Sequence, residues 1–289
     1  MSKGTVVILV IIGSVLLAVA NVAVWAALDV FNPERFGESV AEGLQSSEAS
    51  IALAGPIVDQ LLDESDLPLP VRGVATEAVA WLIQRPLFTP VIKETAAVAF
   101  AAMTTSAQDI VGIDLADAAT NVGATVTGVI SALDPEAGAN AQAALEASLA
   151  ESEESGKLAI YEQGRFPRLR QLANVTPWLA LLTGLGAIVL FVVAYMQAWN
   201  RHAALRYIGV GIMVAAGLSF LLFAPSVQAV AQNNITNPTM RIVVDQVVSV
   251  LIRRFAFQSL LLLFIGLIAL VFNHYRAQQD EPVETSPAV

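Results

Sequence analysis

Four long apolar blocks divide this chain into membrane-like and globular stretches. They cover residues 6–28, 177–199, 207–224 and 255–272. A helix rises about 1.5 Å per residue, so blocks of about 20 residues can cross about 30 Å of hydrocarbon. The pattern therefore predicts four transmembrane helices. The last two blocks are near the lower length limit, so we expect them either to stand nearly upright in the membrane or to extend past these boundaries.

The first block has two interpretations. Lys3 precedes the apolar run, as in a secretory signal peptide, and the Ala-rich end of the run is a hint of a cleavage site. The run is longer than the apolar core of a normal signal peptide. We therefore expect residues 1–28 to form an uncleaved first span with a short cytoplasmic N-terminus.

Aromatic residues mark the ends of the second block. Trp178 and Trp199 lie 21 residues apart, which corresponds to about 32 Å along a helix. That distance matches the two aromatic belts of a bilayer. The sequence therefore predicts that both tryptophans lie at the membrane surfaces, at opposite ends of one helix.

Residues 29–174 have the composition of a globular domain. Asn32-Pro33 is typical of a helix start, with a cap followed by proline at the first position. Further helices are expected over about 48–62, from Pro70 and from Thr89-Pro90, whereas 109–115 and 158–162 alternate like short strands. The predicted fold class is mainly α: a four-helix transmembrane bundle and an α-helical extracytoplasmic domain carrying a two-stranded β element. Residues 277–289 are expected to be a disordered cytoplasmic tail.

The stretch before the fourth block predicts a long helix. It opens with Asn237-Pro238, and no proline follows before Tyr275. Polar residues recur every four positions in its first part, and apolar residues fill the remaining surface. We expect 238–254 to extend the fourth helix outward and to pack its apolar side on the domain, with an interfacial helix turning sharply near Arg253 as the alternative. The polar stripe consists of Arg241, Asp245, Ser249 and Arg253.

Charge separates the domain from the spans. Residues 29–174 contain 21 acidic and 8 basic residues, a net of −13, whereas the rest of the chain is +3 (7 basic minus 4 acidic), which sums to the −10 of the whole chain. Such a domain repels nucleic acid, so no nucleic-acid partner is expected. The chain has no cysteine, which excludes disulfides and cysteine nucleophiles.

Orientation depends on the basic residues near the spans. Lys3 before the first span and the tight basic loop at 200–206 favour a cytoplasmic N-terminus with the domain outside. Three arginines before the second span and three before the fourth favour the reverse. We prefer the domain outside, because Arg253 and Arg254 can extend along a helix to the headgroups.

The order of elements resembles a known group. A single span ending in Asp29 is followed by the Arg35-Phe36 helix, by Pro86-Leu87-Phe88 between two helices, and by the Ile113-Asp114-Leu115 strand. Three closing spans follow, the first two joined by Arg201-His-Ala-Ala-Leu-Arg206. This order resembles a group of uncharacterised multi-pass membrane proteins widespread in actinobacteria. The resemblance implies an extracytoplasmic domain and implies no activity.

Few residues indicate a catalytic or metal-binding site. His202 and His274 lie at predicted cytoplasmic ends of spans, where they cannot reach the acidic domain to form a triad or metal site. The acidic groups at 63–66 and at Asp109, Asp114 and Asp117 lack the spacing of a calcium loop, so no metal or other cofactor is expected.

Small residues in the third span indicate close helix packing instead. Gly211, Ala215 and Ser219 recur every four positions, the spacing that lets two helices approach. Chance in a Gly- and Ala-rich span is the alternative explanation. Asn21 is the one amide that we expect to be deep in a span, and we expect it to bond to a neighbouring helix. No span carries a buried charge, so no proton or ion relay is evident.

Three classes of function can be weighed against these features. The favoured hypothesis is a structural or interaction protein that presents an extracytoplasmic domain to another envelope or membrane protein. A transporter or channel accessory subunit is the alternative, and it would need a polar path through the spans. An enzyme is not expected. The lipid bilayer is the one partner that the composition itself implies.

Overall fold

A computed structural model of the chain describes residues 3–62, 69–86, 88–104, 167–233, 235 and 237–279. It also describes five positions from 131 to 143. Secondary structure within these ranges is entirely helical, which confirms the mainly α class. The strands expected at 109–115 and 158–162 lie outside the described residues. So do the acidic groups at 63–66 and at Asp109, Asp114 and Asp117, and the tail from residue 280 onward.

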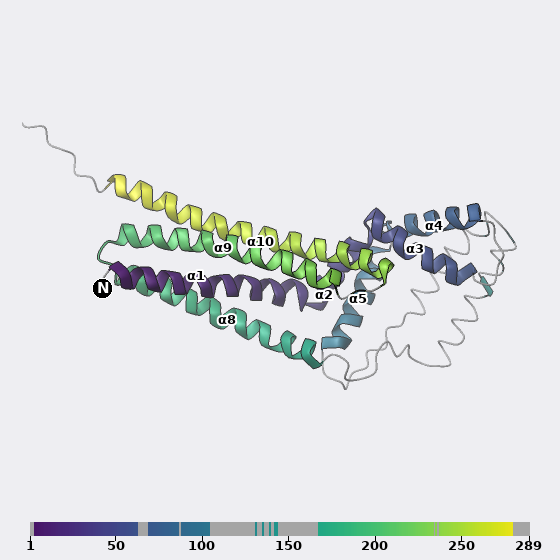
Figure 1. The fold of residues 1–289 in the computed structure, drawn as a ribbon, viewed down its shortest axis with the longest axis horizontal. Coiled ribbons are helices and arrows are strands. Elements are labelled where there is room, and N and C mark those ends of the chain that lie inside the picture. Colours follow the sequence, from purple (N-terminus) through teal and green to yellow (C-terminus); the bar gives the residue numbers. More distant parts are fainter. Residues whose placement is uncertain are drawn as a thin grey trace, which may run out of the picture. The chain divides into compact units, whose positions relative to one another are not determined.

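The described helices fall into short and long classes (Figure 1). Four helical stretches are long and apolar enough to cross a membrane, as the hydrophobic pattern predicted. They are α1 (Lys3–Trp25) with its π-helical end η1 (Ala26–Val30), α8 (Pro167–Met196), α9 (Arg201–Asn233) and α10 (Pro238–Gln279). The shorter helices are α2 (Pro33–Leu44), α3 (Ser47–Leu62), α4 (Leu69–Ile83) and α5 (Thr89–Thr104).

Two helix starts follow the capping pattern that the sequence predicted. The side chain of Asn32 accepts a hydrogen bond from the backbone N–H of Arg35 at 3.1 Å. Asn237 accepts from the backbone N–H groups of Thr239 and Met240 at 2.9 and 3.2 Å. In both cases the cap satisfies N–H groups that have no partner inside the helix. Helix α10 then continues without a break through Arg253, which excludes the sharp turn of the alternative interpretation.

Three of the long helices do not end where their apolar blocks end. Helix α8 begins ten residues before Pro177 and ends at Met196, so Trp199 lies beyond it and the two tryptophans do not mark one helix. Helix α9 begins at Arg201, because Asn200 caps it by accepting from the backbone N–H of Ala203 at 3.1 Å, and it continues through Pro225. Helix α10 begins at Pro238, so it extends before the block at 255–272 as Asn237-Pro238 predicted. Hydropathy marks where apolar residues end, whereas caps decide where helices end.

The described chain divides into two compact units. The first, here called the spanning unit, comprises 1–28, 174–226 and 252–289, and the second, the interspan unit, comprises 29–173 and 227–251. Helices α9 and α10 thus contribute residues to both units. The interspan unit includes the end of α9 and the start of α10 in addition to the segment between the first two spans.

Helix α1 contacts all three other helices of the spanning unit. A Cβ atom added to Gly13 would lie 2.7 Å from the ring of Phe191 in α8. The amide of Asn21 bonds to Ser219 in α9 and to Ser259 in α10. The first helix in the sequence is therefore the central element of this bundle.

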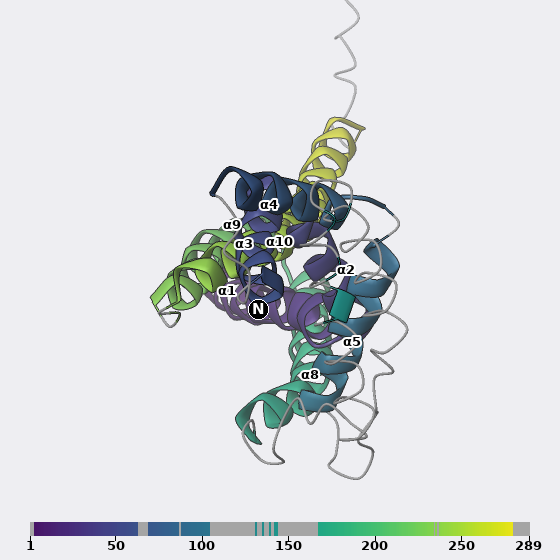
Figure 2. The same cartoon turned by 90° about the vertical axis from the view of Figure 1, so that its right-hand side faces the viewer.

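The interspan unit consists of helix pairs. Helices α3 and α4 share a small apolar core, in which Ala54, Val58 and Val79 are almost fully buried. Helix α2 packs on α5, where the rings of Phe36 and Phe100 stack with centroids 4.3 Å apart. Figure 2 shows α3 beside α4 and α2 beside α5. Short amphipathic helices need such partners, because few are stable alone in water.

Candidate functional site

A buried polar cluster joins three helices of the spanning unit. The side-chain nitrogen of Asn21 donates to the hydroxyls of Ser219 at 2.9 Å and Ser259 at 3.0 Å. The side-chain nitrogen of Gln258 donates to the backbone and side-chain oxygens of Asn21 at 2.9 and 3.0 Å. The amide of Asn21 therefore has partners for both its donor and its acceptor group. We call Asn21, Ser219, Gln258 and Ser259 the amide cluster.

An aromatic layer adjoins the amide cluster, and each of its residues lies one helical turn from a residue of that cluster. Phe255 is 1% exposed. It contacts Trp25 and Phe223, with ring centroids 5.2 and 5.7 Å apart. Trp25 and Phe223 also meet edge to face at 5.4 Å. Aromatic pairs at these separations contribute packing energy between α1, α9 and α10.

The small residues predicted on α9 lie against α1. A Cβ atom at Gly211 would meet the hydroxyl of Ser14 and come within 3.0 Å of Val10. Ala215 is 1% exposed, and Ser219 bonds to Asn21. The structure thus places all three residues on packed surface, where small side chains permit close approach.

A second close approach joins α9 to α10. A Cβ atom at Gly209 would lie 3.0 Å from the backbone oxygen of Gly266 and 2.9 Å from Leu270. A Cβ atom at Gly266 would lie 2.7 Å from Met213. No motif in the sequence marks this pair, because the two glycines lie on different helices.

The polar stripe of α10 is largely solvent-facing. Arg241, Ser249 and Arg253 are exposed, whereas Asp245 is half-buried and accepts from the side chain of Gln232 at 3.1 Å. Among the residues that the structure describes, Asp245 forms no ion pair with Arg241, and its partner is the amide of Gln232 instead.

The apolar side of the same segment packs inside the interspan unit. Val247 is buried, and a Cβ atom added to Gly43 of α2 would lie 2.9 Å from its backbone. Gln246 donates to Glu48 of α3 at 2.7 Å. This part of α10 therefore packs on the helices that follow the first span, as its apolar surface predicted.

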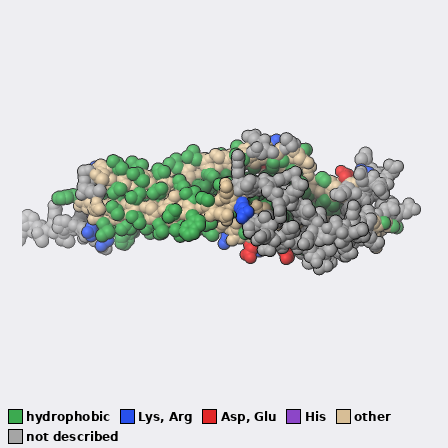
Figure 3. Space-filling view, turned by 90° about the horizontal axis from the view of Figure 1, so that it is seen from below, with side chains coloured by type: hydrophobic (Ala, Val, Ile, Leu, Met, Phe, Trp, Pro, Cys, Tyr) green, Lys and Arg blue, Asp and Glu red, His purple; other side chains and the backbone are tan. Residues whose placement is uncertain are grey.

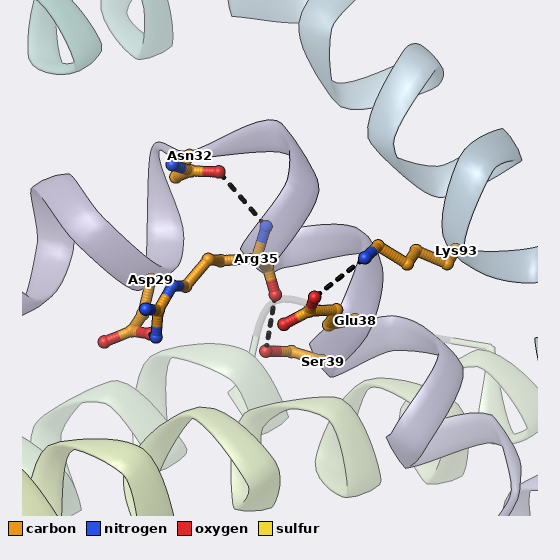
Figure 4. A network of polar contacts seen from close by, with 6 residues as sticks. All are labelled: Asp29, Asn32, Arg35, Glu38, Ser39 and Lys93. Atoms are coloured by element: carbon orange, nitrogen blue, oxygen red, sulfur yellow. Dashed lines mark hydrogen bonds and ion pairs between the residues drawn. The ribbon is translucent and has the colours of Figure 1, made fainter. Parts of the chain in front are cut away.

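Charged residues of the interspan unit gather around α2 (Figure 4). Arg35 lies 3.5 Å from the carboxylate of Asp29, which is buried at the π-helical end of the first helix. Lys93 of α5 donates to Glu38 at 2.7 Å. The hydroxyl of Ser39 donates a hydrogen bond to the backbone carbonyl of Arg35 at 2.9 Å. The network links η1, α2 and α5, and it holds the only deeply buried carboxylate of the described residues.

Two features correct the sequence analysis. Gln258 is a second amide inside a span, and it was missed because the fourth span was expected to begin at Phe255, which placed Gln258 near the boundary. The sequence also did not predict a partner for His202, whose Nδ1 lies 3.3 Å from the side-chain oxygen of Asn273. The amide of Gln258 within an apolar segment was the available signal, whereas nothing in the sequence paired His202 with Asn273.

Groups of His, Asp and Glu with the geometry of a metal site do not occur in the described ranges. Comparisons with protein-family models, with curated proteins and with solved structures found no match.

Proposed function

We propose that this chain is a structural or interaction protein of the cell membrane, in which four spans form a packed base and the interspan unit contacts a protein partner. The interspan unit lies on the extracytoplasmic side in this proposal. The partner is another membrane or envelope protein. The chain performs no covalent chemistry of its own.

The bonding of Asn21 carries this proposal. An amide that lines a substrate path must leave a donor or acceptor for the substrate, whereas both groups of Asn21 are bonded to neighbouring helices. Interhelical hydrogen bonds and close packing are the forces that hold helices together in lipid. The buried amide of Asn21 is thus used for assembly, which favours a base over a transport path.

The interspan unit offers a contact surface of the expected composition. Trp81 of α4 is 54% exposed, and the guanidinium of Arg85 lies over its ring at 3.7 Å. Tryptophan and arginine are enriched among the residues that dominate binding energy at protein interfaces. Val74 lies two turns earlier on the same face and is also exposed. We propose that this face of α4 contacts the partner.

Site-specific photo-crosslinking in intact cells tests the proposal. A photoreactive phenylalanine analogue at Trp81 or Val74 is expected to give a discrete higher-mass product. The matched control is Leu182 of α8, which is 65% exposed and apolar, and which we expect to give only lipid adducts. Products of equal yield at α4 and α8 positions, or none at α4, would argue against an interaction role for this face.

A further inference from the structure

One end of the spanning unit gathers basic residues from three helices. The start of α1, the end of α8 and the start of α9 meet in an apolar cluster built on Val6, Ala194 and Ala204. Helix α10 joins this end through the contact of Asn273 with His202 at 3.3 Å. Lys and Arg side chains are visible at the end of the bundle where α1 begins (Figure 3). The exposed cations of this end are Lys3, Arg201, Arg206 and Arg276.

These four cations differ from the paired cations of the interspan unit. Arg35, Arg72 and Lys93 each lie within 4 Å of a carboxylate. Lys3, Arg201, Arg206 and Arg276 form no ion pair with any residue that the structure describes. Their charge is therefore available to an anion from outside the described chain.

The surroundings of the cations fit a lipid better than a free ion. Arg201 lies over the ring of Tyr195 and Arg276 over the ring of Phe272, at 5.9 and 5.8 Å from the ring centroids. Ile8, Met196 and Phe272 are exposed on the helices that carry or adjoin these cations. Apolar and aromatic surface next to a cation matches an acyl chain below a charged headgroup. A small free anion would contact only the cation and gain nothing from the apolar surface.

We propose that this basic end binds the phosphate headgroup of anionic phospholipids. The guanidinium groups of Arg201 and Arg206 contact the lipid phosphate, Lys3 and Arg276 contribute further charge, and the flanking apolar side chains contact the acyl chains. The inference rests on the proposed insertion of the four helices in a membrane. It does not depend on the orientation of the interspan unit or on a protein partner.

Lipid binding to the purified full chain in detergent tests this proposal. Added phosphatidylglycerol is expected to raise the melting temperature, and phosphatidylcholine is expected to raise it much less. The double substitution Arg201→Gln with Arg206→Gln should weaken phosphatidylglycerol binding by about 30-fold, since each basic residue near an anionic lipid surface contributes roughly fivefold. Salt should weaken binding to the parent chain.

The control removes the same charge elsewhere. Arg85→Gln with Arg241→Gln also deletes two exposed arginines, both from the interspan unit, and should leave phosphatidylglycerol binding unchanged. Arg276→Gln alone provides a milder test if the double variant is unstable, and an effect of about fivefold is expected. Equal stabilisation by the two lipids, equal losses in test and control variants, or full stabilisation by inorganic phosphate alone would each overturn the proposal.

Discussion

The spanning and interspan units join their helices with different chemistry. In the spanning unit, neutral amides and hydroxyls bond across helices, as Asn21 does with Ser219, and glycines bring backbones together. In the interspan unit, charged pairs such as Glu38 with Lys93 lie at half-exposed positions around small apolar cores. Water solvates charged side chains at the surface of a soluble unit, whereas hydrocarbon penalises them.

This contrast explains how one chain carries both parts. Lipid is as apolar as a leucine side chain, so burial of apolar surface gives little driving force between spans, and fit and hydrogen bonds must provide it. The interspan helices gain stability when apolar side chains leave water. Substitutions that are mild in one unit should therefore be severe in the other.

Introducing a charge at the α2–α10 contact should have the largest effect. Val247→Asp places a carboxylate where Val247 packs against Gly43, and it should destabilise the protein by roughly 3 kcal/mol or more. Asp245→Asn, two residues earlier, keeps an oxygen that can accept from Gln232 and should cost less than about 0.5 kcal/mol. Thermal unfolding in detergent measures both. Equal stability of the two variants would contradict the packing of this segment.

A bulky side chain on the α1–α9 contact should be the next most damaging change. Gly211→Leu would collide with Ser14 and Val10 and should cost about 1–3 kcal/mol. Ala215→Leu should act in the same direction, because Ala215 is 1% exposed. Gly217→Leu is the matched control on the same helix, since a Cβ atom there meets nothing within 4 Å. If the melting temperatures of the two glycine variants agree, the face of α9 that carries Gly211 points to lipid.

Removing the central amide should have a smaller but distinct effect. Asn21→Leu deprives Gln258, Ser219 and Ser259 of a shared partner, and a cost of about 1–2 kcal/mol is expected. Thr183→Ala is the control, because the hydroxyl of Thr183 donates only to two carbonyls of its own helix among the described contacts. The same melting measurement applies. A parent-like Asn21→Leu variant would show that close packing alone holds the spans.

Breaking a charged pair of the interspan unit should have the smallest effect. Lys93→Met removes the bond to Glu38. The side chains of Lys93 and Glu38 are 39% and 43% exposed, and ion pairs at such exposed positions contribute about 0.2–1 kcal/mol. The difference from the parent should shrink in high salt. A salt-independent loss of several degrees in melting temperature would indicate that Lys93 acts by packing on α2 and not by its charge.

Local signals in the sequence predicted helices well. Asn32-Pro33 and Asn237-Pro238 marked true helix starts because capping acts over three or four residues. The four spans followed from hydropathy for a similarly local reason. The start of α8 and the end of α9 were missed, since prolines at 177 and 225 lie inside these helices, where a soluble helix would break.

Pairwise features could be predicted only in part. The spacing of Gly211, Ala215 and Ser219 indicated a contact face, but not that the partner is α1. The bond of Asn21 to another helix was predicted, whereas the contribution of Gln258 was not, because no single helix carries the information on which side chains meet. The buried position of Asp29 likewise depends on the π-helical end of α1 and on Arg35.

Cysteine labelling in intact cells tests most directly whether the interspan unit lies outside the cytoplasm. The chain has no cysteine, so single substitutions provide unique thiols. Ser47 is exposed at the start of α3, and Ser286 belongs to the C-terminal tail. The account predicts that Ser47→Cys reacts with a membrane-impermeant thiol reagent, and that Ser286→Cys reacts only after the membrane is opened. Labelling of Ser286→Cys in intact cells, with Ser47→Cys protected, would contradict the account and reverse the topology.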